Sequence, residues 1–261
     1  MKENVYDKES FFEKYGEMLR SKEGLKGAGE WPTLEKILPD FEGKRTLDLG
    51  CGYGWHCMYA ASKGASHVVG IDLSEKMLQE AEKKKESDKI EYHRIGIEDY
   101  DYPSNRFDVV VSSLALHYIE NLEEIFRKVY RTLAQGGTFV FTMEHPIFTA
   151  HGTEDWFYNT AGTAQHWPVD HYFTEGYRET SFLGETVVKF HHTLTSILQG
   201  LLQAGFTITN VIEPQPTKEM LQKIKDMEDK TNKKGDKMEF VVALDKEELK
   251  LFKELIPDFF E

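Results

Sequence analysis

Runs of strand-forming residues alternate with amphipathic stretches through the middle of the chain. The runs lie between turn residues and predict strands at residues 45–49, 66–71, 91–95, 107–112 and 138–143. Between them, apolar residues recur every three or four positions, which predicts helices at residues 55–63, 74–81 and 122–133. Strands that alternate with helices are typical of a parallel, doubly wound sheet with right-handed crossovers.

The segment before this alternation contains aromatic and charged residues. The spacing of Phe11, Phe12, Tyr15, Met18 and Leu19 predicts one amphipathic helix. A second helix is expected at residues 33–38, between Trp31-Pro32 and Pro39. This segment either packs over a ligand crevice or only packs against the outside of the sheet, and the sequence pattern does not decide between the two.

After residue 143 the alternation stops, and it returns only near residue 193. Residues 144–192 are rich in aromatic side chains and histidines, and a long irregular insert in a compact domain is commonly functional. Beyond it we expect a helix at 196–204, a strand at 206–212, a solvated helix and loop at 218–237, a strand at 238–244 and a terminal helix at 247–255.

Composition excludes several classes of protein. With 261 residues, 40% of them hydrophobic, the chain is large enough for one substantial core, and no window is apolar enough to span a membrane. A formal charge of −13 argues against nucleic acid or an anionic membrane as the main partner. Cys51 and Cys57 are the two cysteines, too few for a disulfide framework or a zinc site. With no apolar leader after Met1, these features predict a reduced, cytoplasmic setting.

The strongest chemical signal is the stretch from Thr46 to His56. It contains Asp48 near the end of a predicted strand and three glycines, Gly50, Gly52 and Gly54, before the next helix. Glycines let a ligand approach the backbone closely, and the helix start beyond them offers unpaired N–H groups. The alternative is a turn that links the strand to the helix and binds no ligand.

Further polar residues mark the ends of the neighbouring strands, where ligands bind in an open parallel sheet. Asp72 follows Gly50 by 22 positions, the spacing of a carboxylate that binds ribose hydroxyls. Glu98 and Ser112-Ser113 follow the next two strands. A dinucleotide fingerprint would require glycine where Trp55 stands, and Asp48 would repel a pyrophosphate. A phosphate-free nucleoside with a cationic end, such as S-adenosylmethionine, fits better.

These stretches resemble the motifs of class I S-adenosylmethionine-dependent methyltransferases, in the small-molecule (type 11-like) branch. Residues 47–54 resemble the first motif and residues 71–78 the second, while residues 96–99, 107–110 and 133–137 are similar to later ones. The resemblance implies a Rossmann-like, doubly wound, seven-stranded, mainly parallel sheet in one domain. Its parts would be an N-terminal helical cap (1–40), a cofactor-binding core (41–143), an aromatic lid insert for the acceptor (144–192) and a C-terminal part (193–261).

The resemblance also implies roles for individual residues. Asp48 would lie near the cofactor's ammonium group, through water, and Asp72 would bind its ribose. Gly96 stands where the family often has Asp, so Glu98 must supply the polar contact with adenine. The cofactor-binding residues expected in this way are Tyr15, Arg20, Asp48, Gly50, Cys51, Gly52, Gly54, Asp72, Leu73, Met77, Ile97, Glu98, Ser113 and Leu114.

Methyl transfer from a sulfonium needs positioning and exclusion of water, and a general base only if the acceptor loses a proton. His117, His145 and His191 are the candidates for that base, although such histidines are more often structural. The insert's histidines lack metal-ligand spacing, so no metal is expected. The leading hypothesis is methyl transfer to a small molecule, with S-adenosylhomocysteine as product. The alternatives are a non-catalytic S-adenosylmethionine-binding protein and a nicotinamide-dependent oxidoreductase. The acceptor and the oligomeric state stay open.

Overall fold

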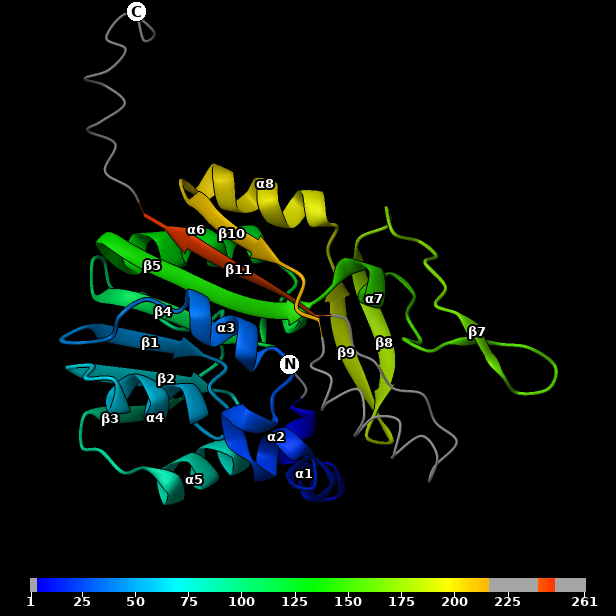
Figure 1. Ribbon diagram of the computed structural model, residues 1–261, viewed down its shortest axis with the longest axis horizontal. Coiled ribbons are helices and arrows are strands. Elements are labelled where there is room, and N and C mark those ends of the chain that lie inside the picture. The colour runs from blue at the N-terminus through cyan, green and yellow to red at the C-terminus, as the bar shows by residue number, and fades with distance from the viewer. Residues whose placement is uncertain (1–3, 216–238, 247–261) are drawn as a thin grey trace, which may run out of the picture.

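A seven-stranded sheet forms the centre of the computed structural model, which describes residues 4–215 and 239–246 (Figure 1). The strand order is β10-β11-β5-β4-β1-β2-β3, and β11 alone runs antiparallel to its two neighbours. The strands are β1 (Arg45–Leu49), β2 (His67–Asp72), β3 (Ile90–Arg94), β4 (Phe107–Ser113), β5 (Leu133–Glu144), β10 (Thr207–Ile212) and β11 (Glu239–Asp245). This is the mainly parallel, Rossmann-like sheet that the sequence predicts.

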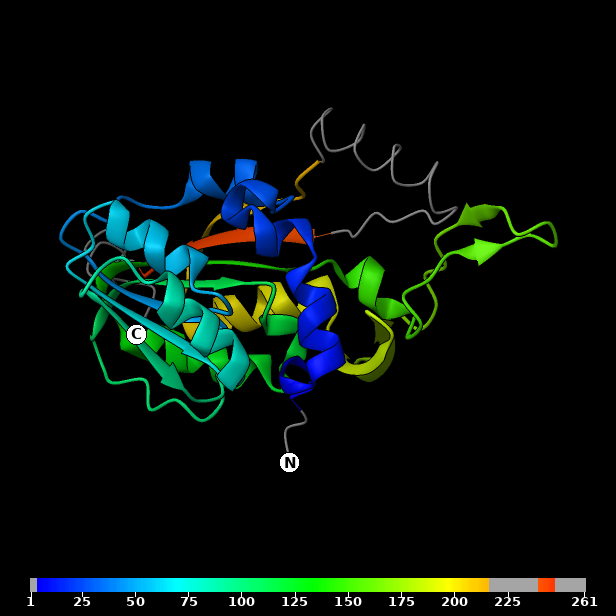
Figure 2. The same cartoon turned by 90° about the horizontal axis from the view of Figure 1, so that it is seen from below.

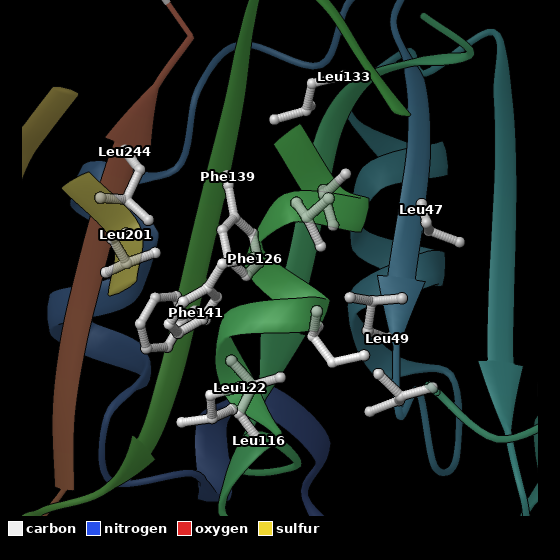
Figure 3. Close-up of a cluster of buried hydrophobic side chains, with 14 of the residues drawn as sticks. Leu47, Leu49, Leu116, Leu122, Phe126, Leu133, Phe139, Phe141, Leu201 and Leu244 are labelled. Atoms are coloured by element: carbon white, nitrogen blue, oxygen red, sulfur yellow. The ribbon is translucent and has the colours of Figure 1, made fainter. Parts of the chain in front are cut away.

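Helices cover both faces of the sheet (Figures 1 and 2). On one face lie α6 (Leu122–Thr132) and α8 (Leu194–Ala204). Figure 3 shows the cluster that they bury, in which the ring of Phe126 stacks 6.1 Å from that of Phe141 on β5. On the other face lie α3 (Trp31–Ile37), α4 (Trp55–Ser62) and α5 (Glu75–Lys84). Because both faces are covered, the central strands are mostly apolar, as β4 is at Phe107 and at Val109–Val111.

The N-terminal segment differs from the prediction of a single first helix. The structure has η1 (Val5–Asp7), α1 (Glu9–Gly16), α2 (Leu19–Lys22) and η2 (Gly24–Gly27) before α3. α1 ends at Gly16, and Met18 adopts an extended conformation before α2. The helical spacing of Phe11 and Tyr15 is therefore real, but Leu19 belongs to the next helix.

The insert is more regular than its sequence indicates. It contains α7 (Pro146–Ala150), a hairpin of β6 (Phe157–Tyr158) and β7 (Ala164–His166), and a hairpin of β8 (Gly176–Phe182) and β9 (Glu185–His191). The turn of the second hairpin is Leu183-Gly184, and both residues have positive φ, as a type I′ hairpin turn requires. The prediction of an irregular insert is therefore wrong. The aromatic residues and histidines of the insert hide the pattern of these strands in the sequence.

Two smaller boundaries also differ. β5 begins at Leu133, five residues before the predicted start, so the two glycines at 136 and 137 lie within the strand. The last strand was expected at 238–244 and is observed as Glu239–Asp245. The predictions for residues 218–237 and 247–255 lie outside the described residues. In the parts that are described, no helix has the length and apolar character needed to cross a membrane.

Candidate functional site

A cavity of about 700 Å³ lies at the carboxyl ends of β1, β2 and β4. The N-terminal segment and the β8–β9 hairpin contribute its other walls. The segment before α3 therefore packs over the cavity. The cavity lining brings together most of the residues expected at the cofactor site, namely Tyr15, Arg20, Gly50, Gly52, Asp72, Leu73, Met77, Ile97, Glu98, Ser113 and Leu114, together with His117.

The glycine loop after β1 has the geometry of a close-approach site. Gly50 and Gly54 have φ of 73° and 75°, in the left-handed region that favours glycine. A Cβ at Gly50 would lie 2.5 Å from the Cβ of Ala115, so a larger residue would displace the cavity wall. Gly54 and Cys51 do not line the cavity. Gly54 instead lies against Tyr92 and precedes α4.

Asp72 joins this loop to β2. Its Oδ2 accepts a hydrogen bond from the N–H of Gly52 at 2.9 Å, and its Oδ1 accepts one from the N–H of Ser74 at 2.8 Å. Burial raises the pKa of Asp72. Each carboxylate oxygen has a further lone pair. The side chain can therefore hold the loop and accept hydrogen bonds from a ligand's hydroxyl groups.

Asp48 lies under the loop and not in the cavity wall. It is 1% exposed, and the Cys57 thiol donates to its Oδ2 at 3.3 Å. Its Oδ1 has no hydrogen-bond partner among the described residues. Burial raises the pKa of this carboxyl to about 7. A buried acceptor without a partner, under the glycine loop, is suited to interact with a cationic group through a bridging water.

A partly buried ion pair attaches the N-terminal cap to the end of β4, beside the cavity. Arg20 Nη2 lies 2.5 Å from Glu30 Oε1, and Glu30 is 1% exposed. The hydroxyl of Ser113, at the end of β4, donates to the same oxygen at 3.2 Å. Trp55 contributes a second attachment, since a Cβ at Gly24 would lie 2.9 Å from its ring. Thus the residue that breaks the dinucleotide fingerprint packs against the cap.

The N-terminal segment also connects the side of the cavity next to α5 with the hairpin side. Asp7 accepts hydrogen bonds from the Ser74 hydroxyl at 2.6 Å and from the Lys76 N–H at 3.1 Å, at the start of α5. On the hairpin side, the rings of Phe11 and Phe182 meet edge to face at 5.5 Å. Lys14 donates to the backbone oxygen of Leu183 at 2.9 Å. The cap and the hairpin therefore form one cover.

His117 lies in η3 (Leu116–Tyr118) and is 2% exposed. Its Nε2 lies 3.9 Å from Oε2 of Glu144, which also lines the cavity. The neighbouring Tyr118 hydroxyl lies 2.9 Å from that of Tyr6. Burial raises the pKa of both tyrosines above its ordinary value. At neutral pH both tyrosines therefore stay protonated. Of the histidines in the described part of the chain, His117 is the one that lines the cavity.

The other two candidate histidines are placed elsewhere. His145 precedes α7, where its Nδ1 accepts from the N–H of Ile147 at 3.1 Å and its Nε2 lies 2.8 Å from Glu213. His191 lies 2.8 Å from the Thr149 hydroxyl through Nδ1 and 2.8 Å from the backbone oxygen of Tyr172 through Nε2. Neither ring lines the cavity. Their hydrogen bonds indicate structural roles, because both nitrogens of each ring are engaged.

Several site residues were missed from the sequence, namely Tyr6, Glu30, Tyr118 and Glu144. For Glu144 a signal existed, because it ends β5 just as Ser113 ends β4, and the strand-end rule used for its neighbours applies to it. The others depend on long-range packing. Among residues 4–215 and 239–246, no three His, Cys, Asp or Glu side chains are placed to hold a metal ion.

Comparison with known proteins adds independent observations. A family model described as a methyltransferase domain matches residues 47–141. A structure described as an S-adenosylmethionine-dependent methyltransferase from Listeria monocytogenes is 49% identical, with a TM-score of 0.78, and the match covers 86% of this chain and all of that one. A second such methyltransferase structure, from Mesorhizobium loti, is 40% identical with a TM-score of 0.75, over 85% of this chain and all of that one.

A relative with a known acceptor matches over a shorter stretch. The phosphoethanolamine N-methyltransferase of Plasmodium falciparum is 32% identical over 121 residues. The match covers 44% of this chain and 46% of that enzyme.

Proposed function

Because the chain belongs to the S-adenosylmethionine-dependent methyltransferases, we propose that it methylates a small molecule bound in the cavity beside His117. The observation that carries the proposal is the composition of one cavity. Its lining contains the glycine loop and Asp72, and it also contains His117, Glu144 and aromatic side chains. A donor and an acceptor can therefore occupy the same cavity.

The residues present fit the cofactor. The Oδ1 of Asp48, which has no partner among the described residues, and the backbone of Gly50, which carries no side chain, are features that a cationic, phosphate-free ligand would use. When bound, the cofactor supplies an activated methyl group. In this assignment Asp72 binds the ribose of the cofactor. Asp48 contacts the cofactor's ammonium group through a water, and Arg20 faces the cofactor's carboxylate. The other contacts are with Tyr15, Gly52, Leu73, Met77, Ile97, Glu98, Ser113 and Leu114.

A small acceptor is favoured by the enclosure and the walls of the cavity. Tyr6, Tyr118, Phe182, Val187 and Phe190 line it, and they come from the cap, η3 and the β8–β9 hairpin. A polymer would have to displace this cover, whereas a small molecule fits beneath it. The relative from Plasmodium falciparum also acts on a small molecule, phosphoethanolamine.

The chain's own contribution to the reaction is positioning, water exclusion and proton transfer. The cap and hairpin bury the cavity, which keeps water from the reacting atoms. The acceptor's nucleophilic atom approaches in line with the bond that breaks. His117 accepts the proton that the acceptor loses, because it is the histidine in the cavity wall.

Small-molecule specificity predicts where a labelled methyl group goes. When the protein and methyl-labelled S-adenosylmethionine are added to a cell extract, we expect new label in the fraction that passes a size filter of about 1 kDa, because the covered cavity excludes polymers. Extract without added protein provides the background. New label confined to protein or nucleic acid would contradict the proposal.

The raised pKa of Asp48 predicts that cofactor binding depends on pH. The free protein holds a proton on Asp48 below about pH 7, and a nearby cation lowers the pKa of a carboxyl. Binding should therefore release that proton, so affinity rises as the pH increases towards about 7 and levels off above it. Calorimetry in buffers of different ionisation enthalpy measures the proton release.

The matched control is Asp48→Asn, which cannot ionise. Comparing the two proteins cancels the titration of the ligand itself. Equal proton release by both proteins would show that Asp48 does not face the ammonium.

A further inference from the structure

One short segment near the N-terminus connects two walls of the cavity. It consists of Asn4 and η1 (Val5–Asp7), and we call these four residues the strap. Asn4, Val5 and Tyr6 line the cavity. The strap packs against α5, and its Tyr6 hydroxyl lies 2.9 Å from the hydroxyl of Tyr118 on η3. Both α5 and η3 also contribute residues to the lining of the same cavity.

The first anchor of the strap is the carboxylate of Asp7, at the start of α5. Its Oδ1 accepts hydrogen bonds from the Ser74 hydroxyl at 2.6 Å and from the N–H of Lys76 at 3.1 Å. Its Oδ2 accepts one from the N–H of Glu75 at 3.4 Å and lies 3.6 Å from Arg94 Nη2. The first N–H groups of a helix have no partner within it, and they favour a negative charge. Burial opposes ionisation of Asp7, but these bonds hold its pKa below the usual value, so a charged group fixes the strap to α5 at neutral pH.

The second anchor is the hydrogen bond between the Tyr6 and Tyr118 hydroxyls. Burial raises the pKa of both tyrosines, so both keep their protons at neutral pH and the bond persists. The two rings also meet edge to face, with centroids 6.2 Å apart. Tyr118 belongs to η3, which also carries His117. The strap is thus fixed to the element that holds the proposed base.

Asn4 connects the two anchoring residues within the strap. Its Nδ2 donates to Asp7 Oδ2 at 2.8 Å, and its Oδ1 accepts from the N–H of Tyr6 at 3.2 Å. These two bonds tie the residues of the strap to one another. A segment that is fixed at both ends and bonded in between opens as one unit.

We propose that Asp7 and Tyr6 are positioning residues that close the strap over the cofactor, so that opening of the strap sets how fast S-adenosylmethionine enters and S-adenosylhomocysteine leaves. The inference rests on the proposed function, because it requires the cofactor to bind in this cavity. Both anchors are bonds between groups of the protein and use no ligand atom, so they act in the free protein and in the complex alike. A closed strap also keeps water from the sulfonium during methyl transfer.

A strap of this kind has a kinetic signature. Weakening an anchor makes the open form more frequent by the same factor in the free protein and in the complex. Association and dissociation should then accelerate together, while Kd, which is the ratio of their rate constants, changes little. A residue that only strengthens the complex would instead change the dissociation rate constant and Kd together.

The test is stopped-flow mixing with S-adenosylhomocysteine, followed by protein fluorescence, which gives both rate constants without an acceptor. Asp7→Asn removes the charge of the first anchor and should raise both rate constants about tenfold. Tyr6→Phe removes one hydroxyl of the second anchor and should raise both by about three- to tenfold. Kd from calorimetry should stay within about threefold of that of the unchanged protein.

Glu17→Gln is the matched control, because Glu17 is 76% exposed at the end of α1 and pairs with Lys22. It should leave both rate constants unchanged. Unchanged rate constants in either folded strap variant would overturn the inference, and so would faster dissociation with an equal loss of affinity. If Asp7→Asn does not fold, Tyr6→Phe decides by the same criteria.

The same experiment separates the strap from the proposed function. If the unchanged protein does not bind S-adenosylhomocysteine, the proposed function fails and the inference fails with it. Binding to the unchanged protein, with rate constants that the two strap variants do not alter, rejects the strap alone.

Discussion

Replacing His117 by Asn should lower the turnover number by about a hundred- to ten-thousand-fold, the usual contribution of a positioned general base. The physical reason is the position of the ring, which lines the cavity 3.9 Å from a buried carboxylate. The cofactor's affinity should stay close to that of the unchanged protein, because His117 is assigned to the acceptor. The measurements are the rate of S-adenosylhomocysteine formation with a saturating acceptor and calorimetry with the cofactor.

His93→Asn is the control for this experiment. His93 lies on β3 with half of its side chain exposed, and it does not line the cavity. We expect its turnover to be unchanged. Turnover of His117→Asn within about fivefold of the unchanged protein would mean that the acceptor needs no base, as for a nucleophile that is already deprotonated.

Asp72→Ala should weaken S-adenosylmethionine binding by about 1 to 3 kcal/mol, which is roughly a five- to 150-fold rise in Kd. Two effects contribute to this loss. The ribose hydroxyls lose an ionised acceptor, and the N–H groups of Gly52 and Ser74 lose the carboxylate that orders the glycine loop. Titration calorimetry with S-adenosylmethionine and with S-adenosylhomocysteine measures both affinities.

Glu75→Gln provides the comparison, because Glu75 starts α5 only three residues later and is half-exposed outside the cavity. Its affinity for the cofactor should not change. If Asp72→Ala bound the cofactor as tightly as the unchanged protein, the ribose assignment would fail, even though the family membership would stand.

Most of the residues that the sequence assigns to the cofactor line one cavity, and they could be grouped from the sequence because the information is local. Asp48, Gly50 and Gly52 lie within one strand-loop-helix connection, and Asp72 ends the neighbouring strand. A parallel sheet brings consecutive strand ends to one edge, so residues that end strands predict a site without coordinates. The methyltransferase resemblance inferred from these motifs is confirmed by the family model and by the two similar structures.

The surroundings of His117 could not be predicted from the sequence, because its neighbours are brought together by packing. His117, Glu144 and Lys189 are far apart in sequence, and Lys189 is on a hairpin that was expected to be irregular. Nothing local distinguishes His117 from His145 or His191. Only the fold shows that the first lines the cavity, while the others are held by hydrogen bonds elsewhere.

By itself, therefore, the sequence determined the sheet, the identity of the cofactor and the strand-end residues expected to hold it, since short-range pattern and chain connectivity encode all three. The tertiary structure decided that the N-terminal segment and the β8–β9 hairpin cover the cavity together. It also decided which of the candidate histidines lines the cavity. These features depend on contacts between distant segments, which a single sequence does not reveal.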